Sequence, residues 1–204
     1  MTILSTNTLF SLNLESEEIV VRELEESARV KKLVAKELAE KIAEASQLVI
    51  ECFGKGGKLL LFGNGGSAAD AQHIATELVC RFQKERKALP ALALSTNSSL
   101  VTAQTNDLGF ETIFSRQIEA WAKKGDIAIA ISTSGNSPNI LEGAKKAKEL
   151  GMRTIGFIGK GGGELKNLVD LPLIVPSDDV PRIQEVHITI GHIICHLVEE
   201  ELFK

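Results

Sequence analysis

The chain has 204 residues, of which 44% are hydrophobic and 25% are charged, and its formal net charge is −4. This length fits one domain over residues 1–204 with a substantial core, and the composition excludes a disordered or collagen-like chain. The acidic balance, without a block of Lys or Arg, argues against a protein that binds nucleic acid through its phosphates. We therefore expect a small molecule or another protein as the partner.

The sequence carries no sign of a membrane span or of export. Its apolar runs, such as Ile127 to Ile131, are far shorter than the roughly 20 residues that cross a bilayer. The N-terminal residues lack the basic start, apolar stretch and cleavage site of an export signal. Cys52, Cys80 and Cys195 lie far apart among apolar neighbours, which favours reduced, buried thiols over a disulfide framework. These features predict a cytoplasmic protein that does not contact a membrane.

The N-terminal part of the chain has the pattern of a long helical segment. From Glu15 to about Phe53, apolar residues recur every three or four positions among Glu and Lys. This spacing predicts an amphipathic helix, in which we expect one break. An α/β core over residues 54–204 follows it.

Within this core, short apolar runs bounded by turn residues alternate with helical patterns. Strands are predicted at 58–63, 91–94, 127–131, 154–158 and 171–175. Helices are predicted at 68–80, 98–105, 111–121, 137–150, 163–168 and about 181–203. Strands separated by helices imply a parallel sheet covered on both faces. Ligands of such sheets bind beyond the carboxyl ends of the strands, so the loops that follow the strands are the first place to look for a site.

Hydroxyl side chains cluster directly after the predicted strand 127–131 and lead into a helix. The cluster consists of Ser132, Thr133, Ser134 and Ser137. Free N–H groups at a helix N-terminus attract an anion, and hydroxyls add donors without adding charge. Pro138 suits the first helical turn, where its missing N–H is not needed. One serine here would be an ordinary helix cap, but four hydroxyls around Gly135 favour a phosphate or carboxylate site.

Two glycine-rich loops also follow predicted strands. Residues 63–67 lack the Lys-Ser/Thr ending of a nucleotide P-loop and the spacing of a dinucleotide fingerprint. Their glycines permit close approach of a ligand to the backbone, but such turns also form for purely steric reasons. Residues 159–163 have no hydroxyl cluster, and we interpret them as a turn.

Polar side chains on two predicted helices are candidate metal ligands. His73 and Glu77 are four residues apart and share a helix face; they suit either one divalent metal or a solvent-facing hydrogen-bonded pair. On the last helix, Gln184 lies about 12 Å along the axis from His192, at 1.5 Å per residue. If both bind one ion, either both side chains are extended within a subunit or they come from different subunits. The second arrangement would place the site at a subunit interface.

Four separated motifs, in the same order along the chain, resemble the phosphoheptose isomerase family, the sedoheptulose 7-phosphate isomerase branch of the SIS fold. They are residues 63–73, 93–107, 131–137 and 182–185, and the similarity extends over roughly Glu15 to Phe203. The resemblance implies a flavodoxin-like three-layer αβα sandwich with a five-stranded parallel sheet. It also implies a homotetramer whose product enters heptose synthesis for bacterial surface polysaccharides such as lipopolysaccharide. The first 14 or so residues have no counterpart in the family, and Pro181 stands where some members carry an acidic residue.

The same resemblance implies the role of each matching residue. The substrate contacts would be Asn64, Gly65, Gly66, Glu77, Asn106, Asp107, Ser132, Thr133, Ser134, Ser137 and Gln184. One zinc ion per subunit would be held by His73, Glu77, Gln184 and His192. Glu77 and His192 would be the acid/base pair. Conversion of a ketose to an aldose moves a proton between C2 and C1 through an enediol, which requires a base, an acid and a group that bears oxyanion charge.

Two other functions are compatible with these motifs. Some relatives of this fold associate with the replication initiator DnaA and, as the resemblance implies, lack the carboxylate and the final histidine. The presence of Glu77 and His192 here favours an enzyme over such a binding factor. The second alternative is an isomerase of another phosphosugar, such as a hexose or pentose phosphate, because a phosphate loop does not recognise chain length.

Overall fold

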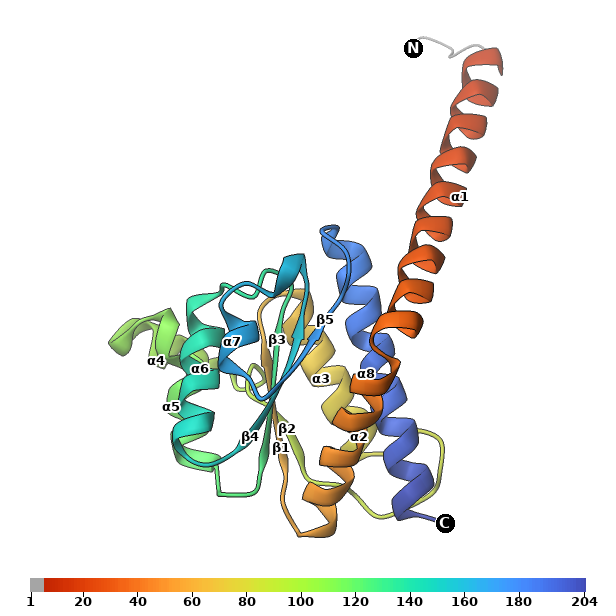
Figure 1. Cartoon of the computed structure of the whole chain (residues 1–204). Helices are drawn as coiled ribbons and strands as arrows, with labels where there is room; N and C mark the ends of the chain where they lie inside the picture. The colour runs from red at the N-terminus through yellow and green to blue at the C-terminus, as the bar shows by residue number, and fades with distance from the viewer. Residues whose placement is uncertain (1–5) are drawn as a thin grey trace.

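The computed structural model describes the backbone of residues 6–204 and the side chains of residues 15–204. Helices and strands alternate along the chain after two N-terminal helices (Figure 1). The strands are β1 (Leu59–Gly63), β2 (Ala91–Ala93), β3 (Ile127–Ser132), β4 (Arg153–Ile158) and β5 (Leu171–Ile174). The α-helices are α1 (Thr6–Glu37), α2 (Ala39–Gly54), α3 (Gly66–Val79), α4 (Ser98–Leu108), α5 (Ile113–Trp121), α6 (Pro138–Glu149), α7 (Leu165–Leu168) and α8 (Val180–Leu202). Short 3-10 turns cover η1 (Phe110–Thr112) and η2 (Lys160–Gly162).

The five strands form one parallel sheet in the order β2-β1-β3-β4-β5. Side chains alternate between the two faces of a strand: Leu59 and Leu61 enter the core beside α2, α3 and α8, whereas Leu60 and Phe62 enter the core beside α5 and α6. Both faces are therefore buried, as Figure 1 shows for the two helical layers. The predicted three-layer αβα sandwich is confirmed, and its strand order is that of flavodoxin-like folds.

The chain order creates a switch point between β1 and β3. From β1 the chain moves outward to β2, and it then returns to the other side of β1 to form β3. Helices that leave neighbouring strands in opposite directions open a crevice at the carboxyl ends of those strands. The loop that follows β1 and the loop that follows β3 border this crevice, so the fold brings both predicted binding loops to one edge.

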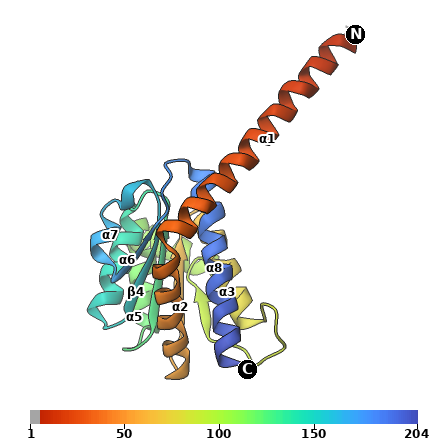
Figure 2. The same ribbon diagram turned by 45° about the vertical axis from the view of Figure 1, so that its right-hand side comes forward.

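The N-terminal segment is helical with one break, as predicted. The break lies at Leu38, between α1 and α2, and α1 begins at Thr6, upstream of the predicted start at Glu15. Figures 1 and 2 show α1 extending away from the sandwich. Its base is tied to α8, where Arg182 Nη1 donates to the Glu23 carbonyl at 2.5 Å and the Ser27 hydroxyl donates to Glu185 at 2.5 Å.

One detail differs from the sequence-based expectations. Cys52 and Cys195 are buried free thiols, but Cys80 is exposed, because it lies just beyond the C-terminal end of α3, where the chain leaves the core. Helix α8 buries Ile190 and Ile194, while Ile193 is 39% exposed, so only part of its apolar circumference faces the core.

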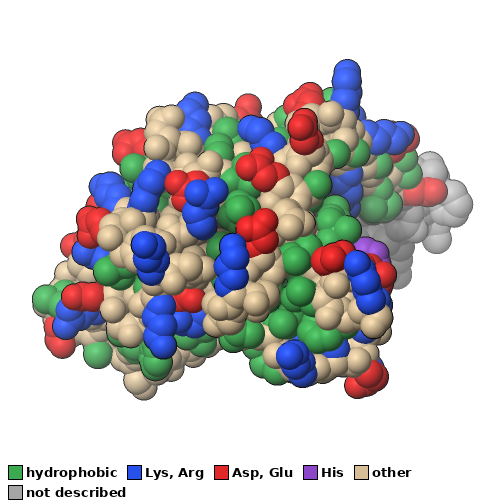
Figure 3. Space-filling model, turned by 60° about the horizontal axis from the view of Figure 1, so that its bottom comes forward, with side chains coloured by type: hydrophobic (Ala, Val, Ile, Leu, Met, Phe, Trp, Pro, Cys, Tyr) green, Lys and Arg blue, Asp and Glu red, His purple; other side chains and the backbone are tan. Residues whose placement is uncertain are grey.

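None of the described helices is long and apolar enough to cross a bilayer. On the face drawn in Figure 3, basic and acidic side chains are interspersed rather than gathered into a block of one sign.

Candidate active site

The loop Ser132–Ser137, here called the serine loop, follows β3 and leads into α6. Ser132 is 4% exposed, and its hydroxyl accepts a hydrogen bond from the Gly135 N–H at 3.1 Å. The Ser134 hydroxyl accepts from the Asn136 N–H at 3.2 Å. Ser137 is the residue before the first turn of α6, but its side chain makes no capping hydrogen bond there. The ordinary capping role therefore does not account for the Ser137 hydroxyl, which leaves it able to bind an anion at the N-terminus of α6.

The second glycine-rich segment, Gly159–Gly163, forms the predicted turn and also supports the serine loop. Gly135 has a φ of +68°, and a Cβ at this position would collide with the Gly162 carbonyl. The Leu165 N–H donates to the Gly135 carbonyl at 2.9 Å, and the Glu164 N–H donates to the Asn136 side chain at 2.9 Å. Glycine is required at this contact, so the conformation of the serine loop is fixed from outside as well as from within.

The loop of residues 63–67, here called the glycine loop, lies on the other side of the switch point. Gly65 has a φ of +54° and open space where a Cβ would point, so a ligand can approach its backbone. A Cβ on Gly66 would instead collide with the side chain of Gln184. The Gln184 side chain from α8 therefore lies against the N-terminus of α3. The Asn64 side chain is paired with Asn139 of α6, a residue that the sequence analysis did not single out.

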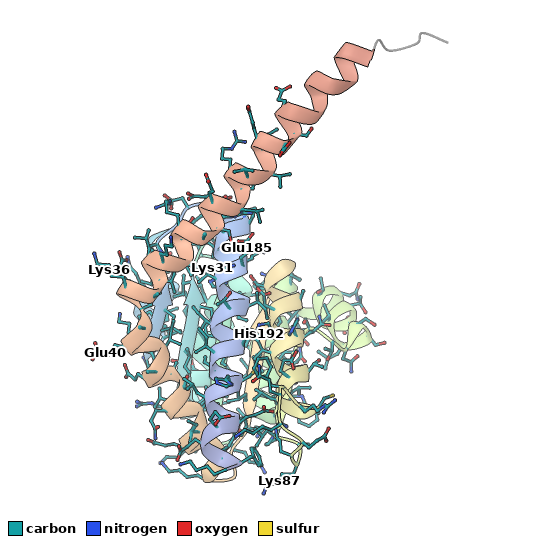
Figure 4. All side chains as sticks on the ribbon, turned by 90° about the vertical axis from the view of Figure 1, so that its right-hand side faces the viewer. Lys31, Lys36, Glu40, Lys87, Glu185 and His192 are labelled. Atoms are coloured by element: carbon teal, nitrogen blue, oxygen red, sulfur yellow. The ribbon has the colours of Figure 1, made fainter. Side chains whose placement is uncertain are left out.

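Three of the four predicted metal ligands converge between α3 and α8. His73, Glu77 and His192, here called the histidine cluster, have ligand atoms that all lie within 4.8 Å of one another. His73 Nε2 is 3.1 Å from Glu77 Oε1 and 3.1 Å from His192 Nε2. Figure 4 shows His192 on the side of α8 that faces α3. The His73 side chain is 47% exposed and that of Glu77 is 23% exposed, so the cluster opens to solvent.

The donor set of the histidine cluster fits a zinc ion. Two imidazole nitrogens and one carboxylate oxygen are typical zinc ligands, at about 2.0–2.2 Å from the metal. Atoms 3.1 Å apart can share one ion at such distances. The His73–Glu77 contact is also the hydrogen-bonded pair that the spacing left open, but His192 supplies a third ligand from another helix.

Other predicted site residues are not joined to this cluster. Within the described residues, Gln184 makes no hydrogen bond to His73, Glu77 or His192. Asn106 and Asp107 are exposed on α4, and the hydrogen bond that involves their side chains is between the two of them, at 2.8 Å. Helix α4 buries none of its residues and lies on the opposite side of the molecule from α8 (Figure 1).

Comparison with known proteins identifies the family. The model of the SIS domain family matches residues 22–159. A phosphoheptose isomerase from Clostridium acetobutylicum is 58% identical over 164 residues, which cover 80% of this chain and 84% of that protein. The chain belongs to the phosphoheptose isomerase family.

Solved structures of family members have the same fold. A phosphoheptose isomerase from Neisseria gonorrhoeae is 40% identical, with a TM-score of 0.86, over 90% of this chain and 98% of that one. A phosphoheptose isomerase from Francisella tularensis is 38% identical, with a TM-score of 0.88, over 91% of this chain and 98% of that one. The family resemblance stated from the four motifs is thus confirmed.

In this member of the family, a buried ion pair holds the segment next to the histidine cluster. Arg86 and Glu199 are each 1% exposed and 3.0 Å apart. Glu199 also accepts hydrogen bonds from three backbone N–H groups, beginning with that of Phe82 at 2.9 Å. Burial alone would raise the pKa of Glu199, but these N–H groups and Arg86 outweigh it, so the pKa is lowered.

This ion pair is connected to the cluster in two ways. Arg86 Nη2 donates to the backbone carbonyl of Glu77 at 2.7 Å, and the Phe82 ring lies 5.4 Å from the His192 ring. This ion pair has little signal in the sequence, because the two charged residues are 113 positions apart and each resembles an ordinary surface residue when read alone.

Asp70 is a further residue that the sequence analysis did not select. It lies one turn before His73 on α3, and its Oδ2 atom is buried without a hydrogen-bond partner in the described chain. Burial raises the pKa of Asp70 to about 6, and the nearby His73 acts in the opposite direction. A carboxyl group that titrates near neutral pH thus lies beside the cluster.

Proposed function

We propose that this protein is an aldose–ketose isomerase that converts sedoheptulose 7-phosphate into D-glycero-D-manno-heptose 7-phosphate. The observation that carries the proposal is the convergence of Glu77 and His192, the candidate acid/base pair, in a chain that belongs to the phosphoheptose isomerase family. The anion-binding geometry of the serine loop supports a phosphorylated substrate.

The histidine cluster lies some way along α3 from the edge of the sheet. Helix α3 begins at the carboxyl edge of β1, and His73 lies seven residues after Gly66, which is about 10 Å along the helix axis. In this proposal the sugar chain extends from the phosphate at the serine loop toward the histidine cluster, where C1 and C2 react.

The reaction is an internal transfer of hydrogen. A base removes a proton from C1 of the ketose, the released electron pair forms the C1–C2 double bond of an enediol, and the oxygen on C2 takes up a proton. Return of a proton to C2, with loss of the proton on O1, leaves an aldehyde at C1. We assign these transfers to Glu77 and His192, because carboxylate and imidazole groups are common general acids and bases in enzymes.

The remaining predicted residues have supporting roles in this proposal. Ser132, Thr133, Ser134, Ser137 and the N-terminus of α6 would bind the phosphate. Asn64, Gly65, Gly66 and Gln184 would contact the sugar. His73, Glu77, Gln184 and His192 would hold one zinc ion, which as a Lewis acid would stabilise negative charge on the enediol oxygens.

A homotetramer is the proposed assembly. Four apolar residues on the projecting part of α1 are exposed, namely Ile19, Val20, Val21 and Leu24. Asn106 and Asp107 lie apart from the histidine cluster of their own chain, and in this proposal they contact the substrate of a second subunit. We further propose a cytoplasmic enzyme whose product enters heptose synthesis for lipopolysaccharide.

The deciding experiment is incubation with a panel of phosphorylated ketoses, with aldose formation followed by NMR. Turnover of sedoheptulose 7-phosphate in preference to hexose and pentose phosphates is expected. Turnover of a shorter ketose instead would favour the alternative of another phosphosugar isomerase. A folded protein that converts none of them would favour a binding factor of the DnaA-associating kind, although such relatives are expected to lack the counterparts of Glu77 and His192.

The zinc assignment has its own test, which is metal content. Emission spectrometry on protein purified without chelator should find about one zinc per chain, and His73→Gln should lower this content. Removal of the metal should lower the rate by about a hundredfold or more, since a Lewis acid contributes several kcal/mol to charge stabilisation. Full activity in protein that contains no metal would remove zinc from the proposal.

A further inference from the structure

Asn64 and Asn139 form a reciprocal pair of side-chain amides. Asn64 Nδ2 donates to Asn139 Oδ1 at 2.9 Å, and Asn139 Nδ2 donates to Asn64 Oδ1 at 2.8 Å. The two residues are 75 positions apart in the chain. Asn139 is 2% exposed, while Asn64 is partly accessible. Two hydrogen bonds of good length in a buried setting fix the orientation of both amides.

The pair lies at the switch point, where it bridges the two candidate binding loops. Asn64 belongs to the glycine loop, and Asn139 lies in the first turn of α6, directly after the serine loop. Strand pairing sets the distance between β1 and β3 only as far as Gly63, which pairs with Ile131. Beyond that point, the amide pair is the one direct hydrogen-bonded link between these loops among the described residues.

The two amides differ in which of their hydrogen-bonding groups remain free for a ligand. A side-chain amide has two N–H donors and an oxygen with two lone pairs, so the pair uses one donor and one acceptor of each residue. Asn64 keeps one N–H and one lone pair on the accessible side. Asn139 is buried and therefore does not reach a ligand itself. The Asn139 amide side chain can therefore influence binding through its contact with Asn64 and the position of the glycine loop.

We propose that Asn139 is a positioning residue, which through its amide pair with Asn64 holds the glycine loop at a fixed separation from the serine loop. A phosphate ester bound at the serine loop then meets the glycine-loop backbone and the free N–H of Asn64 without a prior rearrangement. This inference rests on the proposed function for its substrate, but the link between the loops can be tested with phosphate alone.

The chemistry of the pair suggests a specific variant, Asn139→Asp. The introduced carboxylate can only accept hydrogen bonds, so one of its oxygens would face Asn64 Oδ1 and the pair would open. A protonated carboxyl group has one donor and one acceptor and can reform both hydrogen bonds. Burial favours the neutral acid, and no charged side chain of the described chain hydrogen-bonds to either amide. The variant should therefore lose the pair at high pH and regain it at low pH.

The experiment compares the wild-type protein, Asn139→Asp and Asn139→Leu at pH 8 and pH 6. It measures the KM for sedoheptulose 7-phosphate and the Kd for inorganic phosphate, each as a ratio to the wild-type value at the same pH. Taking the ratio at the same pH corrects for the change in protonation of the ligand, whose second pKa lies near 6 for a phosphate ester. Asn167→Asp is the control, because it makes the same substitution at an exposed position whose side chain forms no hydrogen bond with the described residues.

We expect both ratios for Asn139→Asp to be about tenfold or more at pH 8, as for the loss of one or two hydrogen bonds, and to fall toward one at pH 6. For Asn139→Leu they should be raised at both pH values, and for Asn167→Asp they should stay near one. Unchanged ratios at pH 8 in a folded Asn139→Asp protein would overturn the proposal. Ratios near one in Asn139→Leu would also overturn it, because the effect of Asn139→Asp would then be repulsion between its carboxylate and the phosphate. The proposal would also be overturned if the melting temperature of Asn139→Asp recovered at pH 6 while its KM and Kd ratios did not. Asn139 would then stabilise the fold without positioning the glycine loop for binding.

A second variant covers the case in which Asn139→Asp does not fold at pH 8. Asn64→Asp alters the same pair from its more accessible side and should give the same dependence of phosphate affinity on pH. Absence of that dependence in a folded protein would contradict the role of the pair. If the wild-type protein binds phosphate but does not convert sedoheptulose 7-phosphate, the proposed substrate fails, while the phosphate measurements still decide the role of Asn139.

Discussion

The serine loop and the histidine cluster are the two halves of the proposed site, and they are built in different ways. The serine loop is held by its own hydroxyls, by Gly159–Gly163 and by the amide pair. The histidine cluster opens to solvent, and its three polar groups contact one another. Two imidazole nitrogens that face each other at 3.1 Å repel unless a proton or a cation lies between them.

This difference indicates what each half needs in order to work. The serine loop is preorganised by the chain, so an anion can bind without reorganising it. The histidine cluster is complete only with a bound cation, a proton or a substrate between its ligand atoms. We therefore expect changes in the cluster to act mainly on kcat and changes in the serine loop to act mainly on KM.

The largest expected effect is the loss of turnover in Glu77→Gln. Removal of a general acid/base typically lowers the rate by about 10²- to 10⁴-fold, and the partly exposed side chain of Glu77 has no core role that would unfold the protein. Proton exchange at C1 and C2 of sedoheptulose 7-phosphate, followed by NMR, measures the effect. Glu85→Gln, which removes an exposed carboxylate paired with Arg81, is the control. Undiminished exchange in Glu77→Gln would refute the catalytic assignment. It would also contradict the expectation that changes in the histidine cluster act mainly on kcat.

The next effect concerns the support of the histidine cluster. Arg86→Met leaves the Glu199 carboxylate buried without its cation, and breaking a buried ion pair in this way costs about 3–5 kcal/mol. Arg81→Met, at a side chain that is 59% exposed, should change the free energy of unfolding by less than about 1 kcal/mol. Urea denaturation measures both. Equal, small losses in the two variants would mean that Arg86 does not anchor the segment beside Phe82 and His192.

The sequence was sufficient for features whose signal is local. Apolar periodicity and flanking glycines located the strands and indicated one break in the N-terminal helical segment, and clustered hydroxyls located the serine loop. It was not sufficient for pairs of residues far apart in the chain, such as Asn64 with Asn139 or Arg86 with Glu199. Each partner looks ordinary by itself, and only the fold brings the two together. The exposure of Cys80 was also missed, because apolar neighbours in the sequence do not show where a helix leaves the core.

A smaller effect is expected in the serine loop. Ser132→Ala removes a hydroxyl that is 4% exposed and accepts from the Gly135 N–H. A hydrogen bond to a charged group contributes about 1.5–3 kcal/mol, so the KM for sedoheptulose 7-phosphate should rise by about 10- to 100-fold while kcat changes little. Steady-state kinetics measure this split, and Ser115→Ala on α5 is the control. An unchanged KM would count against the phosphate assignment, and a loss confined to kcat would contradict the contrast with the histidine cluster.

The smallest effect concerns the stability of the core, away from both halves of the proposed site. His187 is fully buried on α8, and burial lowers its pKa from 6.5 to about 4. The unfolded chain therefore binds a proton on His187 below pH 6.5, whereas the folded protein does not until about pH 4. Stability from the neutral imidazole is present above pH 6.5 and is lost as the pH falls toward 4, by about 1.4 kcal/mol per pH unit.

Removal of this titration should flatten the pH dependence of unfolding. Between pH 7.5 and pH 5, the wild-type protein should lose about 2 kcal/mol more of its free energy of unfolding than His187→Leu, as measured by urea denaturation at each pH. Activity at each pH should be the same in the two proteins, because His187 is buried in the core and is not a member of the histidine cluster. A parallel loss of stability in both proteins would show that His187 is not the group responsible. A loss of activity at pH 5 that is confined to the wild-type protein would instead show that protonation of His187 in the core also disturbs the site.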